Sequence, residues 1–382
     1  MKKAGLLLLC GALVFTACQK DNVPSKDATL GGTSVDVSGI TTSARKLFVL
    51  NEGGMGSNNA TLDFLRFKDG MFVTSAFKKM NPDVGGGLGD VGNDIAIRGD
   101  EAWIVVNNSG IVEVISAKDE IEIAAIEVPT PRNIAVDGNY AYVTSWAGAF
   151  VTYEGYTVTD SRNPKGQVYR INLNTKQVDG SVEVGYQPEG IAVYNGKLYV
   201  ANSGGISSQL APDYAYDNTL SIINASSFKV EKTVPVQVNL KNVYSDGKGN
   251  IYVTTLGNYM DVHSGLYILS AAAPDQVRKV SDFVSISAIA GDAVYCVGTE
   301  TEFDFGAEHT YSAWSVTAGV KKPVTLNLKD ATPYGLAVLD ADTLFVGDAG
   351  DYFNPGKVSC YLKGAQIWSV TAGVCPGHFA LY

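Results

Sequence analysis

The sequence is poor in charge, in histidine and in cysteine motifs, and each shortage argues against a class of protein. Charged residues make up 18% of the 382 residues, below the ~25% of an average soluble domain. A net charge of −10 provides no basic surface for phosphate backbones, which argues against nucleic-acid binding. The three His residues share no short metal-ligand spacing, and there is no CxxC pair. We therefore expect no metal site and no nucleic-acid partner.

The N-terminus resembles the signal of a bacterial lipoprotein. Lys2 and Lys3 precede an apolar stretch, Gly5 to Phe15, that is too short to span a bilayer. The segment 15–18 ends at Cys18 and is similar to a lipobox, although Phe15 stands where Leu is usual. We expect lipidation at Cys18, with ordinary secretion as the alternative. This predicts a signal peptide over 1–17, a lipidated Cys with a flexible tether over 18–43, and a folded domain over 44–382.

An internal repeat predicts the fold. Seven short segments of the form small-apolar-small recur at intervals of roughly 40–50 residues, and most are followed by a turn and a second apolar segment. The first segments are centred on Ile95, Ile134, Ile191, Val243, Ile289, Leu336 and Phe379. No stretch shows a sustained helical period. Four strands per repeat at this spacing is typical of a β-propeller blade.

The two ends of the repeat are complementary. The second-strand segment 47–52 has no first strand before it, and the first-strand segment 377–382 has no second strand after it. We therefore predict an all-β, seven-bladed β-propeller in which N-terminal strands pair with the C-terminal strand to close the ring. Two separate β-sandwiches would explain neither the repeat nor these ends.

One face of the predicted ring carries all the long loops. In a four-stranded blade the 2–3 loops and the links to the next blade share a face, and long loops on a rigid scaffold usually carry function. These segments are rich in aromatic, amide and acidic residues, a mixture suited to a large amphipathic ligand. The candidate ligand-binding residues on them are Asn51, Asn107, Asn108, Trp146, Phe150, Tyr153, Tyr156, Tyr186, Asn202, Tyr214, Tyr216, Tyr259, Asp348 and Tyr352. The alternative is that the aromatic residues only pack the loops together.

A second set of candidates lies where the innermost strands begin. These positions would ring the mouth of a central channel, and their side chains would either contact a ligand or join neighbouring blades. The residues are Arg132, Glu189, Asn242, Tyr334 and His378.

The blade motif resembles the YncE-like propellers. Pro188 to Val193 followed by Leu198 to Asn202 matches that pattern closely. The whole chain also resembles one group in that family, the surface-exposed, cobalamin-capturing BtuG-like lipoproteins. The resemblance rests on the lipobox, Lys20-Asp21, the tether, seven blades and the long loops of the third and fourth blades. It implies a lipid-anchored protein on the outer face of the outer membrane, which captures cobalamin with high affinity and passes it to a TonB-dependent transporter.

Two other function classes remain open. Aromatic platforms also suit a glycan- or peptide-binding adhesion propeller. Some related propellers are enzymes, but the sequence contains no Ser-His-Asp spacing or nucleophile elbow, and Gly85 to Gly89 is not followed by a helix as a phosphate loop requires. We therefore expect a binding protein with no catalytic residues and no cofactor.

Overall fold

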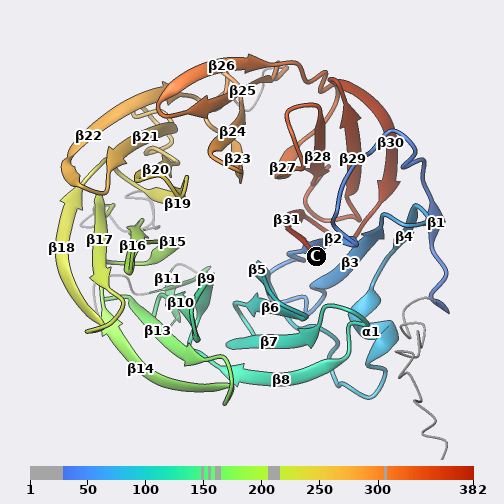
Figure 1. Cartoon of the computed structure of the whole chain (residues 1–382), viewed down its shortest axis with the longest axis horizontal. Coiled ribbons are helices and arrows are strands. Elements are labelled where there is room, and N and C mark those ends of the chain that lie inside the picture. The colour runs from blue at the N-terminus through green and yellow to red at the C-terminus, as the bar shows by residue number, and fades with distance from the viewer. Residues whose placement is uncertain (1–28, 148–149, 154–155, 160–164, 205–215, 305–307) are drawn as a thin grey trace, which may run out of the picture.

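A computed structural model describes residues 29–147, 150–153, 156–159, 165–204, 216–304 and 308–382; the side chains of 150–153 and 156–159 are outside the description. The described residues form one five-stranded and six four-stranded antiparallel sheets, arranged as seven blades around an axis, and one two-stranded hairpin sheet (Figure 1). The predicted seven-bladed β-propeller is therefore confirmed.

The blades follow one another along the chain. Blade 1 holds β1 (Thr33–Ser34), β2 (Lys46–Asn51), β3 (Thr61–Arg66), β4 (Met71–Val73) and β31 (Pro376–Leu381). Blade 2 follows a short helix, α1 (Ala76–Met80), and holds β5 (Gly92–Arg98), β6 (Glu101–Val106), β7 (Ile111–Ser116) and β8 (Glu122–Glu127). Blade 3 holds β9 (Pro131–Asp137), β10 (Tyr140–Ser145), β13 (Gln167–Asn172) and β14 (Gln177–Glu183), with an inserted hairpin of β11 (Phe150–Tyr153) and β12 (Tyr156–Thr159).

The remaining four blades have four consecutive strands each. Blade 4 holds β15 (Pro188–Tyr194), β16 (Lys197–Asn202), β17 (Thr219–Asn224) and β18 (Lys229–Pro235). Blade 5 holds β19 (Leu240–Ser245), β20 (Asn250–Thr255), β21 (Gly265–Ser270) and β22 (Ala273–Asp282). Blade 6 holds β23 (Ile286–Ala290), β24 (Ala293–Gly298), β25 (Ser312–Thr317) and β26 (Val320–Val324). Blade 7 holds β27 (Pro333–Val338), β28 (Thr343–Asp348), β29 (Lys357–Leu362) and β30 (Ala365–Thr371).

The two ends of the described chain close the ring in blade 1. Strand β31 pairs with β2 in antiparallel register, with Leu47 opposite Leu381 and Val49 opposite Phe379. Figure 1 shows β31 as the innermost strand of this blade, beside β2. The predicted closure is therefore confirmed, and each inner strand that the structure describes has a partner.

The core lies between blades rather than inside one central mass. Seven apolar clusters fill the seven interfaces between neighbouring blades. Strand β2 shows how this works: Leu47 and Val49 face blade 7, while Phe48 and Leu50 face blade 2. Because side chains alternate along a strand and both faces of the sheet are covered, every β2 residue is buried. This explains the continuous apolar runs of the second strands.

Short turns join the strands on one face of the ring. Between β15 and β16, Asn195 and Gly196 have φ values of 48° and 71°. Positive φ at both central residues is the type I′ geometry that an Asn-Gly hairpin favours. This face carries no insertions, so the long loops leave the opposite end of the strands.

The predicted tether differs in part from the structure. Residues 18–28 lie outside the described residues, but β1 pairs with β4 and extends blade 1 to five strands. Val35 N donates to Gly70 O (2.8 Å), and the indole of Trp368 in blade 7 donates to Asp36 O (2.9 Å). The expectation of a flexible tether is therefore wrong for residues 33–40, because Val35, Val37 and Ile40 pack on the interface between blades 7 and 1.

Among the described residues, no helix has both the length and the apolar character needed to cross a membrane.

Candidate functional site

The starts of the innermost strands meet the long loops at one end of the ring. Pro131 at the start of β9 pairs with Ser145, the last residue of β10, and Pro188 at the start of β15 pairs with Asn202. Each inner strand therefore begins where the 2–3 loop of its blade leaves the sheet. We call this end the long-loop face.

Polar side chains from neighbouring blades form an axial cluster on this face, consisting of Asn93, Arg132, Glu189, Lys241 and His378. Two nitrogens of Arg132 donate to Glu189: Nε to Oε1 at 3.1 Å and to Oε2 at 3.3 Å, and Nη2 to Oε2 at 3.1 Å. Its third nitrogen donates to Asn93 Oδ1 at 2.7 Å, and Lys241 Nζ lies 3.3 Å from Glu189 Oε2. The cluster thus joins blades 2, 3, 4 and 5 through their first strands.

A glycine brings two members of the axial cluster together. Gly190 follows Glu189, and a Cβ atom at Gly190 would lie 2.7 Å from the Cα of Asn242 and from the carbonyl oxygen of Lys241. Only a residue without a side chain allows β15 and β19 to approach this closely. The Gly190 in the predicted blade motif therefore has a direct consequence for the site, since it places Lys241 beside Glu189.

The electrostatics of the cluster follow from its burial and its charges. Burial alone would raise the pKa of Glu189, but Arg132 and Lys241 outweigh it and hold that pKa below its ordinary value. Burial, with Lys241 and Arg132 adding to it, lowers the pKa of His378 to about 3, so this imidazole is neutral at pH 7. Burial raises the pKa of Asp94, one residue after Asn93, to about 6, against hydrogen bonds from Ile134 N and Asn133 Nδ2.

Aromatic side chains surround the axial cluster on the same face. The Trp146 ring lies over the Arg132 guanidinium, 4.4 Å from its centroid to Cζ. Tyr334 donates a short hydrogen bond from its hydroxyl to Glu52 and packs edge-to-face on Tyr352. His263 stacks on Phe303 with ring centroids 5.2 Å apart, and Tyr259 meets the same Phe303 edge-on.

Exposed apolar side chains form a rim on three 2–3 loops. The apolar rim consists of Met55 in blade 1, Tyr259 and Met260 in blade 5, and Tyr352 and Phe353 in blade 7. Phe353 is 85% exposed and Tyr352 is 49% exposed. The other large exposed apolar residues that the structure describes lie on outermost strands and on β31. All five rim residues lie on loops of the long-loop face, and two of them, Tyr259 and Tyr352, also pack against Phe303 and Tyr334.

Several predicted contact residues have a different role in the structure. The amides of Asn51, Asn107 and Asn202 are buried and donate to Thr61, Pro131 and Thr219, so they hold strand ends together. Asn108 Nδ2 donates to Asp90, and Asp348 accepts two backbone N–H groups in its own turn. These two side chains stabilise their loops, although Asn108 is also exposed to solvent.

The other predicted residues fall into three groups. Arg132, Glu189 and His378 belong to the axial cluster, while Asn242 points to Ser287 in the next blade. Trp146, Tyr259, Tyr334 and Tyr352 line the face around it, and Tyr186 and Tyr216 are partly buried in its loops. The side chains of Phe150, Tyr153, Tyr156 and Tyr214 lie outside the described residues, as does Cys18.

Sequence reasoning missed Lys241 and Asn93. Both occupy the repeat position that follows the first residue of the inner strand, as Arg132 and Glu189 do. If the seven inner strands are aligned by repeat position, and candidates are chosen by that position and not by residue type, Lys241 is selected in place of its neighbour Asn242.

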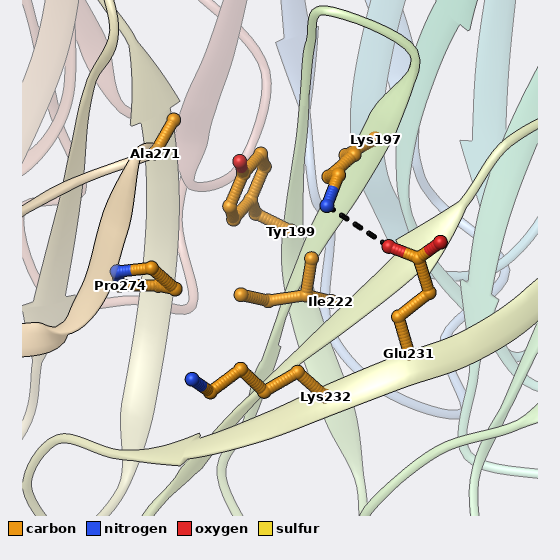
Figure 2. Close-up of a pocket in the computed structure, with 7 residues that line it drawn as sticks. All are labelled: Lys197, Tyr199, Ile222, Glu231, Lys232, Ala271 and Pro274. Atoms are coloured by element: carbon orange, nitrogen blue, oxygen red, sulfur yellow. Dashed lines mark ion pairs between the residues drawn. The ribbon is translucent and has the colours of Figure 1, made fainter.

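The opposite face has a shallow groove between blades 4 and 5. Figure 2 shows the residues around this hollow of about 230 Å³, which are Lys197, Tyr199, Ile222, Glu231, Lys232, Ala271 and Pro274. Its charges are paired: Lys197 lies 2.9 Å from Glu231, and Lys232 is paired with Asp275. Since these are exposed, mutually neutralised pairs on strands β16, β18 and β22, the groove is less suited to binding a ligand than the long-loop face.

Comparison with known proteins supports the fold alone. The sequence matches no family model and no curated protein. Among similar solved structures is the hydrazine synthase of Kuenenia stuttgartiensis, with a TM-score of 0.56 and 16% identity over 75% of this chain and 88% of that one. Another is a putative 6-phosphogluconolactonase from Bacteroides fragilis, with a TM-score of 0.59 and 10% identity over 90% of this chain and 99% of that one. At such identities the chain is similar to these proteins in its propeller fold.

Proposed function

We propose that this protein is a cell-surface lipoprotein that captures a corrinoid such as cobalamin on its long-loop face and delivers it to a TonB-dependent transporter in the outer membrane. The observation that carries the proposal is the apolar rim around the axial cluster. A corrinoid is a broad macrocycle with amide groups at its edge. Apolar and aromatic side chains would cover the macrocycle, and polar groups near the axis would bond to its substituents.

The scaffold supports tight binding. The seven blades interlock through their apolar interfaces, so the loop bases are fixed before a ligand arrives. Stacking of Trp146 on Arg132 and of His263 on Phe303 also orders side chains in advance. A preordered site loses less conformational entropy on binding, which favours affinity.

The binding test uses the purified chain from residue 29 onward, which retains β1. Mixed with cobalamin at micromolar concentration and passed through gel filtration, the protein peak is expected to be pink. A colourless protein peak would contradict corrinoid capture. If the protein peak is colourless and the protein binds to a glycan or peptide array, the alternative of an adhesion propeller is favoured instead.

Variants in the apolar rim test where the ligand sits. The double variant Tyr352→Ala/Phe353→Ala is expected to weaken cobalamin binding by about tenfold or more, because two exposed rings lose their contact area. The matched control is Ile123→Ala/Val320→Ala, which removes exposed apolar side chains from the outermost strands β8 and β26. Calorimetric titration should show the control binding like the wild type. Equal affinities for all three proteins would place the ligand away from the rim.

The enzyme names of the structural neighbours describe those proteins. At 10–16% identity, no enzymatic activity of this chain is inferred from them. Within the described residues, no group of three or more His, Cys, Asp or Glu side chains is placed to hold a metal ion. We propose a binding role rather than a catalytic one, and hydrolysis assays on lactones would test the alternative directly.

A further inference from the structure

The axial cluster contains hydrogen-bond donors that the fold does not use. Lys241 Nζ makes one contact among the described residues, the 3.3 Å contact to Glu189, and the Lys241 side chain is 33% exposed. An ammonium group has three N–H donors, so the remaining two can point to solvent or to a ligand. The neutral His378 imidazole also has one N–H donor, and no described residue bonds to its ring.

Charged groups of both signs act on His378. Lys241 and Arg132 both disfavour protonation of this ring, while Glu189 acts in the opposite direction and more weakly. Glu189 is shared between the two cations, so one carboxylate compensates two positive charges. A second acid, Asp94, accepts hydrogen bonds from the backbone N–H groups of Ile95 and Ile134 and from Asn133, and its pKa of about 6 leaves it ionised at pH 7. The two acids balance the two cations in charge, so the attraction for an oxyanion comes from the N–H donors of Lys241 and His378 that no described residue uses.

Arg132 is held in place while Lys241 is free to adapt. The Arg132 guanidinium is bonded to Asn93 and Glu189 and is covered by Trp146. It therefore contributes charge without moving. Lys241 has a flexible stem and a partly exposed side chain, so it can turn toward a bound group while Arg132 continues to neutralise Glu189.

We propose that the axial cluster binds an oxyanion of the ligand, a phosphate ester or a carboxylate, through Lys241 and His378. The ligand's identity rests on the proposed function, but the oxyanion site itself does not. For a corrinoid the group would be the phosphodiester of the nucleotide arm, which cobalamin carries and cobinamide lacks. The site would then make the protein selective for complete corrinoids.

The first experiment tests the site without a corrinoid. The chain has three His residues, so their ring signals are separable by NMR, and a His378→Gln variant assigns the one of interest. Titration with inorganic phosphate to tens of millimolar is expected to shift the His378 signal in a saturable way. The shift should disappear in Lys241→Met and persist in Lys241→Arg, which keeps the charge.

Lys248→Met is the matched control for that titration. Lys248 lies in the same blade on the opposite face, where it is paired with Asp292 at 2.5 Å. It should leave the phosphate response of His378 unchanged. A wild-type signal that phosphate does not move, or an equal shift in Lys241→Met, would overturn the oxyanion site.

The second experiment compares cobalamin with cobinamide by calorimetry. Wild type is expected to bind cobalamin about tenfold more tightly, in line with one charge-assisted hydrogen bond. Lys241→Met should lose this preference by weakening cobalamin alone. If both corrinoids bind equally to wild type, the proposed selectivity fails while corrinoid capture stands. If neither binds, the capture proposal fails and the phosphate titration still decides the oxyanion site.

Discussion

At the residue scale, burial decides what a polar side chain does. Asn51, Asn107 and Asn202 are of a residue type that often contacts ligands. In this fold each side chain is buried and donates a hydrogen bond to a neighbouring strand or loop. A buried amide without a hydrogen-bond partner costs free energy, so these Asn side chains serve to stabilise the fold. Lys241, whose side chain is partly exposed and whose ammonium group contacts Glu189 alone among the described residues, keeps N–H donors available.

Glu113 is a buried acid that forms an ion pair with no cation among the described residues. It lies on β7 between Ile111 and Ile115, whose side chains face the interface between blades 1 and 2, and alternation along the strand places Glu113 there too. Burial, with Glu122 adding to it, raises the pKa of Glu113 from 4.5 to about 8. No described residue bonds to its Oε1 atom.

This acid predicts a pH-dependent loss of stability. Above pH 4.5 the unfolded chain releases the Glu113 proton while the folded chain keeps it until about pH 8. The stability that Glu113 contributes is therefore complete below pH 4.5 and lost as the pH rises to about 8. Glu113→Gln should be more stable than wild type at pH 8 by about 2 kcal/mol, and not at pH 4.5.

Urea denaturation at the two pH values measures this difference. Glu127→Gln, on the exposed side of β8 in the same blade, is the control and should follow wild type at both. A Glu113→Gln advantage that is equal at pH 4.5 and pH 8 would show that packing, and not ionisation, explains it.

At the element scale, the N-terminal segment is part of the propeller. Strand β1 covers the edge of β4, and Val35, Val37 and Ile40 pack where blades 7 and 1 meet. An open β4 edge would also be free to pair with another chain. The sequence of this segment is mostly polar and lacks a regular pattern, and for this reason it predicts a flexible tether.

Removing this segment should lower stability without opening the ring. A chain starting at Ala44 is expected to be less stable than one starting at Thr29 by about 2 kcal/mol, from the apolar area it no longer buries. Its unfolding should remain a single cooperative transition. Equal melting temperatures for the two chains would show that residues 29–43 contribute nothing.

At the scale of the whole molecule, ring closure links distant parts of the chain. Strand β31 supplies the inner strand of blade 1, and Phe379, Ala380 and Tyr382 pack into the interfaces on both sides of that blade. Arg45 N and Lys46 N both donate to Tyr382 O, which adds a further tie between the ends of the described chain.

Closure predicts a strong effect of a short truncation. Deleting residues 376–382 exposes the edge of β2 and opens two apolar interfaces. We expect the melting temperature to fall by more than roughly 10 °C, or the cooperative transition to disappear. Calorimetry should measure the melting temperatures of the chain that ends at Cys375 and of the chain that lacks residues 29–43, so that the two deletions can be compared. A similar small effect of both deletions would contradict a ring held closed by β31.

The sequence alone determined the architecture. The recurrence of the strand motif requires a repeated sheet, since each unit has apolar side chains on both faces and must be covered by its neighbours. The unmatched segments at 47–52 and 377–382 predict closure because an unpaired inner strand would leave its backbone unsatisfied. The Asn-Gly turn at Asn195 and the face that carries the long loops follow from the same local rules.

Only the tertiary structure decided which polar residues remain available. The docking of residues 33–40 depends on Trp368 and on the edge of β4, which are far away in the sequence. The axial cluster depends on the close approach of β15 and β19 at Gly190, and the roles of Lys241 and of the buried Asn residues follow from that packing. Local patterns specify strands and turns, whereas hydrogen-bond partners and charge balance are set by groups that meet only when the ring closes.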